Sequence, residues 1–104
     1  MAVYRIELAA KAKRDMLEIH AYIADNLKEQ GIADRLLDKI ETEILTLKNM
    51  PLKHNIDRDG QLKHRNLRKL LVDNYLIFYT VYEKTKTVII VRVLYAHRDW
   101  LNLF

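Results

Sequence analysis

The chain has 104 residues, half of them hydrophobic, which predicts a single domain over residues 1–104 with one core. It contains no cysteine and no serine, so disulfide bonds, thiol chemistry and a serine nucleophile are excluded. The net charge is +4, and the longest uncharged run, 74–82, is too short to span a membrane, so we expect a cytoplasmic protein without a membrane partner.

The first half of the chain predicts one strand and two helices. Apolar and charged residues alternate over Tyr4–Leu8, which is typical of a half-buried strand. From Ala9 the apolar spacing becomes helical, and Asp15 lies off the apolar stripe. Gly31 is expected to end this helix in a left-handed cap, and a second apolar stripe runs over 33–47. The short link between the stripes predicts an antiparallel helix hairpin.

The second half predicts a basic loop followed by three strands. Residues 52–64 are polar, and strands are expected over 65–72, 75–82 and 87–94. Asp73-Asn74 suits a two-residue hairpin turn, because both residue types tolerate positive φ. The resulting fold class is α+β, β-α-α-β-β-β, with an antiparallel helix hairpin packed on one face of a mostly antiparallel four-stranded sheet.

The positive charge is concentrated in residues 53–69, which carry six basic side chains against two acidic ones and account for the whole net charge. Such a segment either attracts phosphate backbones and acidic protein surfaces or is an ordinary solvated loop. Lys53, Lys63 and Arg65 are therefore candidates for binding a target.

Two arginines are predicted within strands. Arg68 shares a face with Leu70, so it needs a partner. It either forms an internal salt bridge, with Glu7 or Asp73, or captures a phosphate or carboxylate with its planar guanidinium. Arg92 lies in the middle of its strand, and we expect a structural role for it.

The C-terminal segment holds residues suited to nucleic-acid chemistry. His97 can exchange a proton near neutral pH, and Arg98 can stabilise a pentavalent phosphate. Tyr95 or Trp100 can stack on a base. These are the parts of a metal-free ribonuclease that uses the 2′-hydroxyl of RNA as nucleophile. The alternative is that Trp100 and the apolar residues after it form a short amphipathic segment that packs on the core. Asp99 would then cap this segment.

The histidine spacing and the glycine content favour neither a metal nor a cofactor. No two histidines have ligand spacing on one element, so we expect no metal site. Gly31 and Gly60 are the only glycines, which excludes glycine-rich phosphate loops, and we expect no cofactor.

Arg68, the run Tyr75–Tyr79 and the run Val91–Asp99 resemble the RelE/ParE superfamily of bacterial toxins. The resemblance implies this same element order and a toxin of a type II toxin–antitoxin system, neutralised by a cognate antitoxin. It implies a target that is either DNA gyrase or the ribosome with its mRNA. Toxin–antitoxin complexes of this kind are also candidates for binding operator DNA.

The sequence resembles the ParE branch more than the ribonuclease branch. Leu76 stands where the ribonuclease branch has a catalytic arginine, and the run 75–79 with Arg92-Val93-Leu94 looks ParE-like. This favours gyrase inhibition without an enzymatic activity.

Two other segments favour a ribosome-dependent mRNA endoribonuclease instead. Pro51–Asn55 resembles a segment of the YoeB ribonucleases, and Ala96–Asp99 resembles the tail of the YafQ type. The candidate catalytic residues are then His97, Arg98, Arg68 and His54. A third alternative is a simple nucleic-acid-binding module.

Overall fold

The computed structural model describes residues 3–52 and 66–98. The elements follow the predicted order, with a π-helical turn η1 after the first helix and a 3₁₀ turn η2 after the second. Their bounds are β1 (Arg5–Leu8), α1 (Ala10–Ala21), η1 (Tyr22–Asn26), α2 (Gln30–Leu45), η2 (Thr46–Lys48), β2 (Arg68–Val72), β3 (Tyr75–Tyr82) and β4 (Thr87–Tyr95). Within the described ranges, none of the helices has the length and apolar character needed to cross a bilayer.

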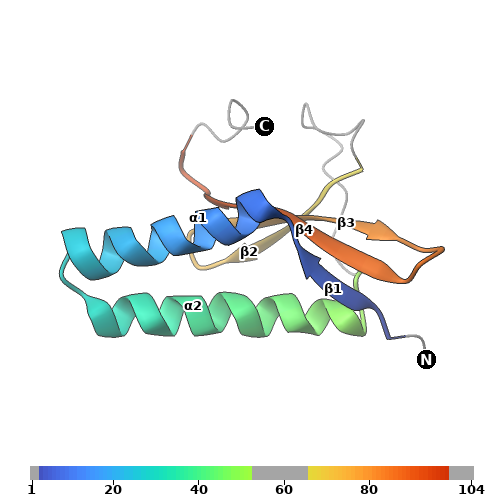
Figure 1. The fold of residues 1–104 in the computed structure, drawn as a ribbon, viewed down its shortest axis with the longest axis horizontal. Helices are drawn as coiled ribbons and strands as arrows, with labels where there is room; N and C mark the ends of the chain where they lie inside the picture. The colour runs from blue at the N-terminus through green and yellow to red at the C-terminus, as the bar shows by residue number, and fades with distance from the viewer. Residues whose placement is uncertain (1–2, 53–65, 99–104) are drawn as a thin grey trace.

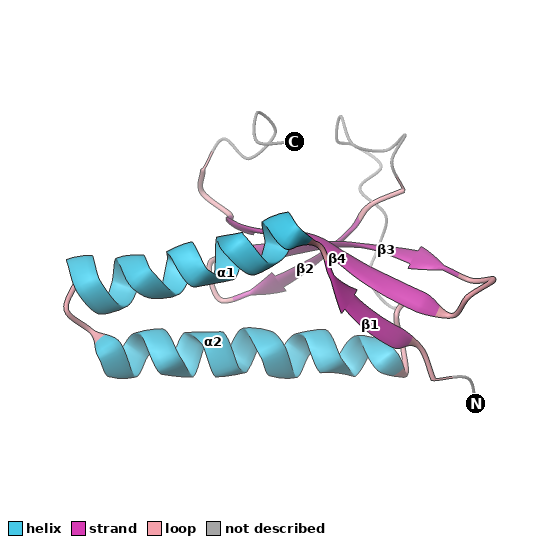
Figure 2. Cartoon of the chain, viewed as in Figure 1, coloured by secondary structure: helices cyan, strands magenta, loops and turns pink. Residues whose placement is uncertain are grey.

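The four strands form one mixed sheet in the order β1-β4-β3-β2. β1 runs parallel to β4, whereas β4–β3 and β3–β2 are antiparallel pairs. The helices α1 and α2 lie side by side in opposite directions (Figure 1), and their link lies at the end away from the strands (Figure 2). The predicted α+β class and helix hairpin are confirmed.

The main core lies between the helix hairpin and one face of the sheet. Its buried members come from both layers: Tyr4, Ala12, Met16, Ile40, Ile44, Leu47, Leu70, Val72, Ile77, Tyr79, Val88, Ile90 and Val93. A smaller cluster of Leu67, Phe78 and Leu94 lies apart from it. Because side chains alternate along a strand, Phe78 faces away from the helices when Ile77 faces them. The sheet therefore has an apolar centre on both faces.

The prediction that Gly31 caps the first helix is wrong. Gly31 lies inside the first turn of α2, which begins early because the Ala33 N–H donates to the Glu29 carbonyl at 2.9 Å. The first helix ends instead in the wide π-helical turn, and Lys28 takes the left-handed conformation at φ 56°. The regular apolar stripe carried no sign of this wider turn.

The strands lie close to their predicted positions. β3 has the predicted bounds, and β4 extends one residue further, to Tyr95. β2 begins later than predicted, since Asn66 has a positive φ of 53° that a strand does not adopt. The tight turn before β3 is confirmed: Asp73 has a φ of 52°, so it takes the left-handed conformation that this residue type tolerates.

Candidate functional site

Three aromatic rings meet where β4 ends. Tyr75, the first residue of β3, pairs in register with Tyr95, the last residue of β4. Their rings pack edge to face, with centroids 5.6 Å apart and planes at 61°. The His97 ring lies 5.2 Å from the Tyr95 ring at 63°. We call Tyr75, Tyr95 and His97 the aromatic cluster; Tyr95 and His97 are exposed and open to a partner.

The turn that follows β4 is held against the β2–β3 turn. The Ala96 N–H donates to the Asn74 carbonyl at 2.7 Å, and the Arg98 N–H donates to the Tyr95 carbonyl at 3.2 Å. His97 Nε2 lies 3.4 Å from Asn74 Oδ1. The backbone therefore brings three predicted site residues, Tyr95, His97 and Arg98, into one short turn.

The β2–β3 turn is in turn tied to a helix. Lys39 Nζ of α2 donates to Asp73 Oδ1 at 2.7 Å. This hydrogen bond raises the pKa of Lys39 above its ordinary value. The helix hairpin thus contacts the turn on which the aromatic cluster rests.

Tyr75 is the partly buried member of the aromatic cluster. Burial raises the pKa of its phenol, and the nearby phenols of Tyr95 and Tyr22 raise it further. Tyr22 begins η1, is 55% exposed and brings the first helical segment towards the cluster. The sequence analysis did not single out Tyr22, because its place next to Tyr75 depends on how the helix packs beside the sheet.

A buried ion pair joins α1 to β4 just before the cluster. Arg92 Nε and Nη2 donate to Asp15 Oδ2 and Oδ1 at 2.7 and 2.9 Å, and the Val93 N–H donates to Asp15 Oδ2 at 3.0 Å. The hydrogen bond to Asp15 raises the pKa of Arg92. Arg92 thus has the structural partner expected of it. The prediction that Asp15 lies off the apolar stripe is wrong, because Asp15 is buried on the same face of α1 as Ala12 and Met16.

Arg68 shares its face with Leu70, as predicted, but its predicted partners are wrong. Glu7 lies on β1, at the opposite edge of the sheet, and Asp73 is bound by Lys39. One carboxylate that feels the charge of Arg68 is Glu83. Hydrogen bonds from Lys86 and then Tyr4 lower the Glu83 pKa most, and Arg68 adds a smaller effect.

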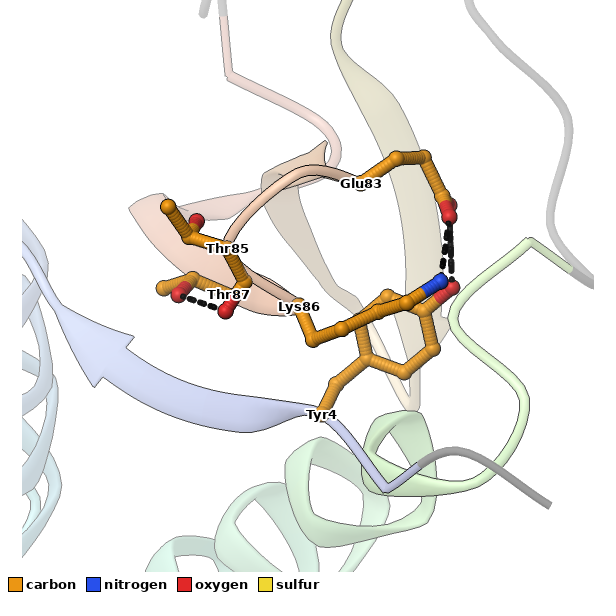
Figure 3. Close-up of polar contacts among 5 residues, drawn as sticks. All are labelled: Tyr4, Glu83, Thr85, Lys86 and Thr87. Carbon is orange, nitrogen blue, oxygen red and sulfur yellow. Dashed lines mark hydrogen bonds and ion pairs between the residues drawn. The ribbon is translucent and has the colours of Figure 1, made fainter.

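Glu83 belongs to a polar network at the far end of β3 (Figure 3). The Tyr4 hydroxyl lies 2.9 Å from both Glu83 carboxylate oxygens, and Lys86 Nζ lies 3.0 Å from Oε2. Lys86 Nζ also stands 5.1 Å from the centroid of the Tyr4 ring. The network fastens the start of β1 to the β3–β4 turn.

The structure separates Arg68 from the aromatic cluster. Arg68 pairs with Tyr79, whereas Val72, four residues along β2, pairs with Tyr75. At the rise of an extended strand this separation is about 13 Å. A site built on His97 and Arg98 therefore does not include Arg68 in this conformation.

Five predicted site residues lie outside the described residues. They are Lys53, His54, Lys63, Arg65 and Trp100. Their roles stay predictions, as does the cap from Asp99.

The sequence matches the family of ParE toxins of type II toxin–antitoxin systems over residues 6–100. This chain belongs to the ParE toxin family. No curated protein sequence matches it.

Solved toxin structures share the fold of this ParE-family toxin. The chromosomal ParDE system of Pseudomonas aeruginosa matches with a TM-score of 0.75 at 15% identity, over 91% of this chain and 98% of that one. The RelBE2 complex of Mycobacterium tuberculosis matches with 0.69 at 19% identity, over 91% and 93%. A free mutant of the Escherichia coli RelE toxin matches with 0.64 at 11% identity, over 97% and 92%. Membership of this family makes the protein a ParE-type toxin of a type II toxin–antitoxin system, and the solved structures share its fold.

Proposed function

We propose that this ParE-family toxin arrests growth by binding DNA gyrase, without cleaving RNA itself. The observation that carries the proposal is Leu76, which pairs in register with Leu94 and packs with Phe78. The resemblance to ribonuclease toxins implies an arginine at this position. Here an apolar side chain is part of a hydrophobic cluster, which offers no charge to a phosphate.

The arginine closest in register to Leu76 is also committed to another role. Arg92 pairs with Phe78, two residues from Leu76, but its guanidinium makes two hydrogen bonds to Asp15. Of the arginines in the described residues, Arg98 is the one that lies in the turn of the aromatic cluster. An exposed surface of tyrosine, histidine and arginine suits a protein contact, since tyrosine and arginine are enriched where interfaces bind most strongly.

One observation favours the ribonuclease alternative. His97 lies against the Tyr95 ring and near the Asn74 side chain, in an exposed turn that an RNA strand is able to reach. A histidine in such a place is able to act as general acid or base towards a 2′-hydroxyl. This alternative requires proton transfer by His97, whereas gyrase binding does not.

The proposal extends to the partners of the toxin. We propose that a segment of the antitoxin folds on binding across the helix hairpin and the sheet, because such segments cover large surfaces. Lys53, Lys63 and Arg65 then contact the acidic or phosphate-bearing surface of the target in the cytoplasm, and the toxin–antitoxin complex binds operator DNA.

Growth arrest in bacteria tests the proposal and its alternative together. Expression of the toxin alone should stop growth, and co-expression of the antitoxin should restore it. Plasmids from arrested cells should show altered supercoiling or breaks, while primer extension should find reporter mRNA intact. Site-specific cuts in mRNA with normal plasmid topology would favour the ribonuclease instead.

A further inference from the structure

The second half of β4 lacks a strand neighbour on one side. The pairing of β1 with β4 ends at Leu8 and Ile90, and the Ala9 N–H donates to the Ile90 carbonyl at 2.9 Å. The chain then enters α1, and within the described residues no strand continues beside 91–95 on that side. The β3–β4 register also shifts here, so that Val91 forms a bulge.

Asp15 takes the place of the missing strand. Its Oδ2 accepts the Val93 N–H at 3.0 Å, a backbone group that a neighbouring strand would otherwise bind. The same carboxylate receives the forked guanidinium of Arg92, which is the first residue after the bulge. The two side chains are only 9% and 13% exposed. One carboxylate therefore fixes the backbone and the side chain of β4 at its most irregular point.

The segment held in this way carries the aromatic cluster. Tyr95 lies two residues after Val93, and the turn with His97 and Arg98 follows directly. On its other side β4 is held by β3, through the pairs that end with Tyr75 and Tyr95. The direction in which this turn leaves the sheet thus depends on β3 and on Asp15.

A pair that served stability alone would not need to be ionic. Removing two charges from water costs roughly as much as their attraction returns, and apolar residues of similar size often replace a buried pair without loss of stability. What an apolar pair cannot supply is a bidentate geometry together with an acceptor for a backbone N–H. The chemistry of Asp15 and Arg92 therefore fits a requirement for orientation.

We propose that Asp15 and Arg92 are positioning residues of the toxin, which fix the end of β4 so that Tyr95, His97 and Arg98 form one target-binding surface. The identity of the target rests on the proposed function, but the positioning itself does not. Neither residue needs to touch the target for this role.

Two substitutions change the pair without emptying the space. Asp15→Asn keeps an oxygen for the Val93 N–H but removes the charge opposite Arg92. Arg92→Lys keeps the charge but cannot form the forked contact. Asp34→Asn is the control, because it makes the same chemical change in a carboxylate that contacts His20 Nε2, also at 2.7 Å, on the helix hairpin.

The variants are compared by two measurements. Nuclear Overhauser contacts between the Tyr75, Tyr95 and His97 rings report the geometry directly, without any target. The toxin concentration that halves supercoiling by purified gyrase reports function. We expect both variants of the pair to weaken the ring contacts and to raise this concentration about 10-fold or more, because a loss of about 1.4 kcal/mol of contact energy weakens binding tenfold. Asp34→Asn should leave both unchanged.

Ile40→Val separates positioning from stability. This fully buried α2 residue loses one methyl group and hence some stability, with no change of charge. Unchanged ring contacts in folded Asp15→Asn or Arg92→Lys, or a loss no greater than that in an equally destabilised Ile40→Val, would overturn the proposal. If Asp15→Asn does not fold, Arg92→Lys decides. If the wild type does not inhibit gyrase, the proposed function fails. The ring contacts, together with growth arrest by each variant in bacteria, then still test the positioning role of Asp15 and Arg92.

Discussion

Tyr79 offers a quantitative test of the core, because one side chain fills the centre of the sheet and also makes a buried hydrogen bond. Its side chain is fully buried, and its hydroxyl donates to the Pro51 carbonyl at 2.7 Å. Tyr79→Phe removes the donor and leaves a buried carbonyl without this partner, which costs about 1–3 kcal/mol. Tyr79→Ala removes the ring as well and leaves a cavity, which costs about 3–5 kcal/mol.

Urea unfolding followed by circular dichroism measures these losses. With a slope of about 1.5 kcal/mol per molar urea, the midpoint should fall by about 0.7–2 M in Tyr79→Phe and by about 2–3 M in Tyr79→Ala. Tyr82→Phe and Tyr82→Ala are the controls, since Tyr82 ends the same strand and is 52% exposed. Each should change stability by no more than about 0.5 kcal/mol. Equal losses at the two positions would refute the assignment of Tyr79 to the core.

Three further predictions concern the link and the titrating groups. Gly31→Ala should stabilise the protein by about 0.5–1 kcal/mol in the same urea assay, because Gly31 is helical and, among the described residues, a Cβ there meets only Arg35 Nη1, at 3.6 Å. A loss of stability would instead support the left-handed cap at Gly31. Glu83 has a lowered pKa, so its contribution to stability is present above the ordinary glutamate pKa and is lost as the pH falls through the folded value. In thermal unfolding, Glu83→Gln should therefore lose less stability in acid than the wild type does. Tyr75 has a raised pKa, so its contribution to stability is present below the ordinary tyrosine pKa and is lost as the pH rises through the folded value. ¹³C-tyrosine NMR should find the Tyr75 phenol titrating above the ordinary tyrosine pKa. A Tyr75 signal that titrates at or below the ordinary tyrosine pKa would contradict the packing of the aromatic cluster.

The sequence allowed the fold to be predicted because local patterns and the overall arrangement agree. The β-branched run of β4 indicates a strand, and the two apolar stripes indicate two helices that each bury one face. The tight turn at Asp73 sets the register of β2 against β3. The link between the helices was mispredicted because Gly31 was taken as the stop signal. A π-helical turn and a left-handed lysine leave no pattern in the apolar spacing.

The candidate site was predicted only where it is continuous in the sequence. Tyr95, His97 and Arg98 follow one another after a strand, so their proximity needed no knowledge of packing. Tyr22 and Asp15 come from the first helical segment, 70 or more residues earlier, and their contribution depends on how α1 covers the open side of β4. The distance of Arg68 from the cluster likewise follows from its register with Tyr79.

The central claim, that the toxin binds gyrase and performs no reaction itself, is tested most directly by His97→Ala. Purified wild-type toxin and this variant are each given to gyrase with relaxed plasmid, and to a translating extract with a defined mRNA. The claim predicts that the wild type inhibits supercoiling, that His97→Ala weakens this inhibition by no more than about tenfold through the loss of one contact side chain, and that neither protein cleaves the mRNA. Loss of a general acid or base typically slows a reaction by about 100-fold to 10,000-fold. Site-specific mRNA cleavage by the wild type that disappears in His97→Ala would contradict the claim.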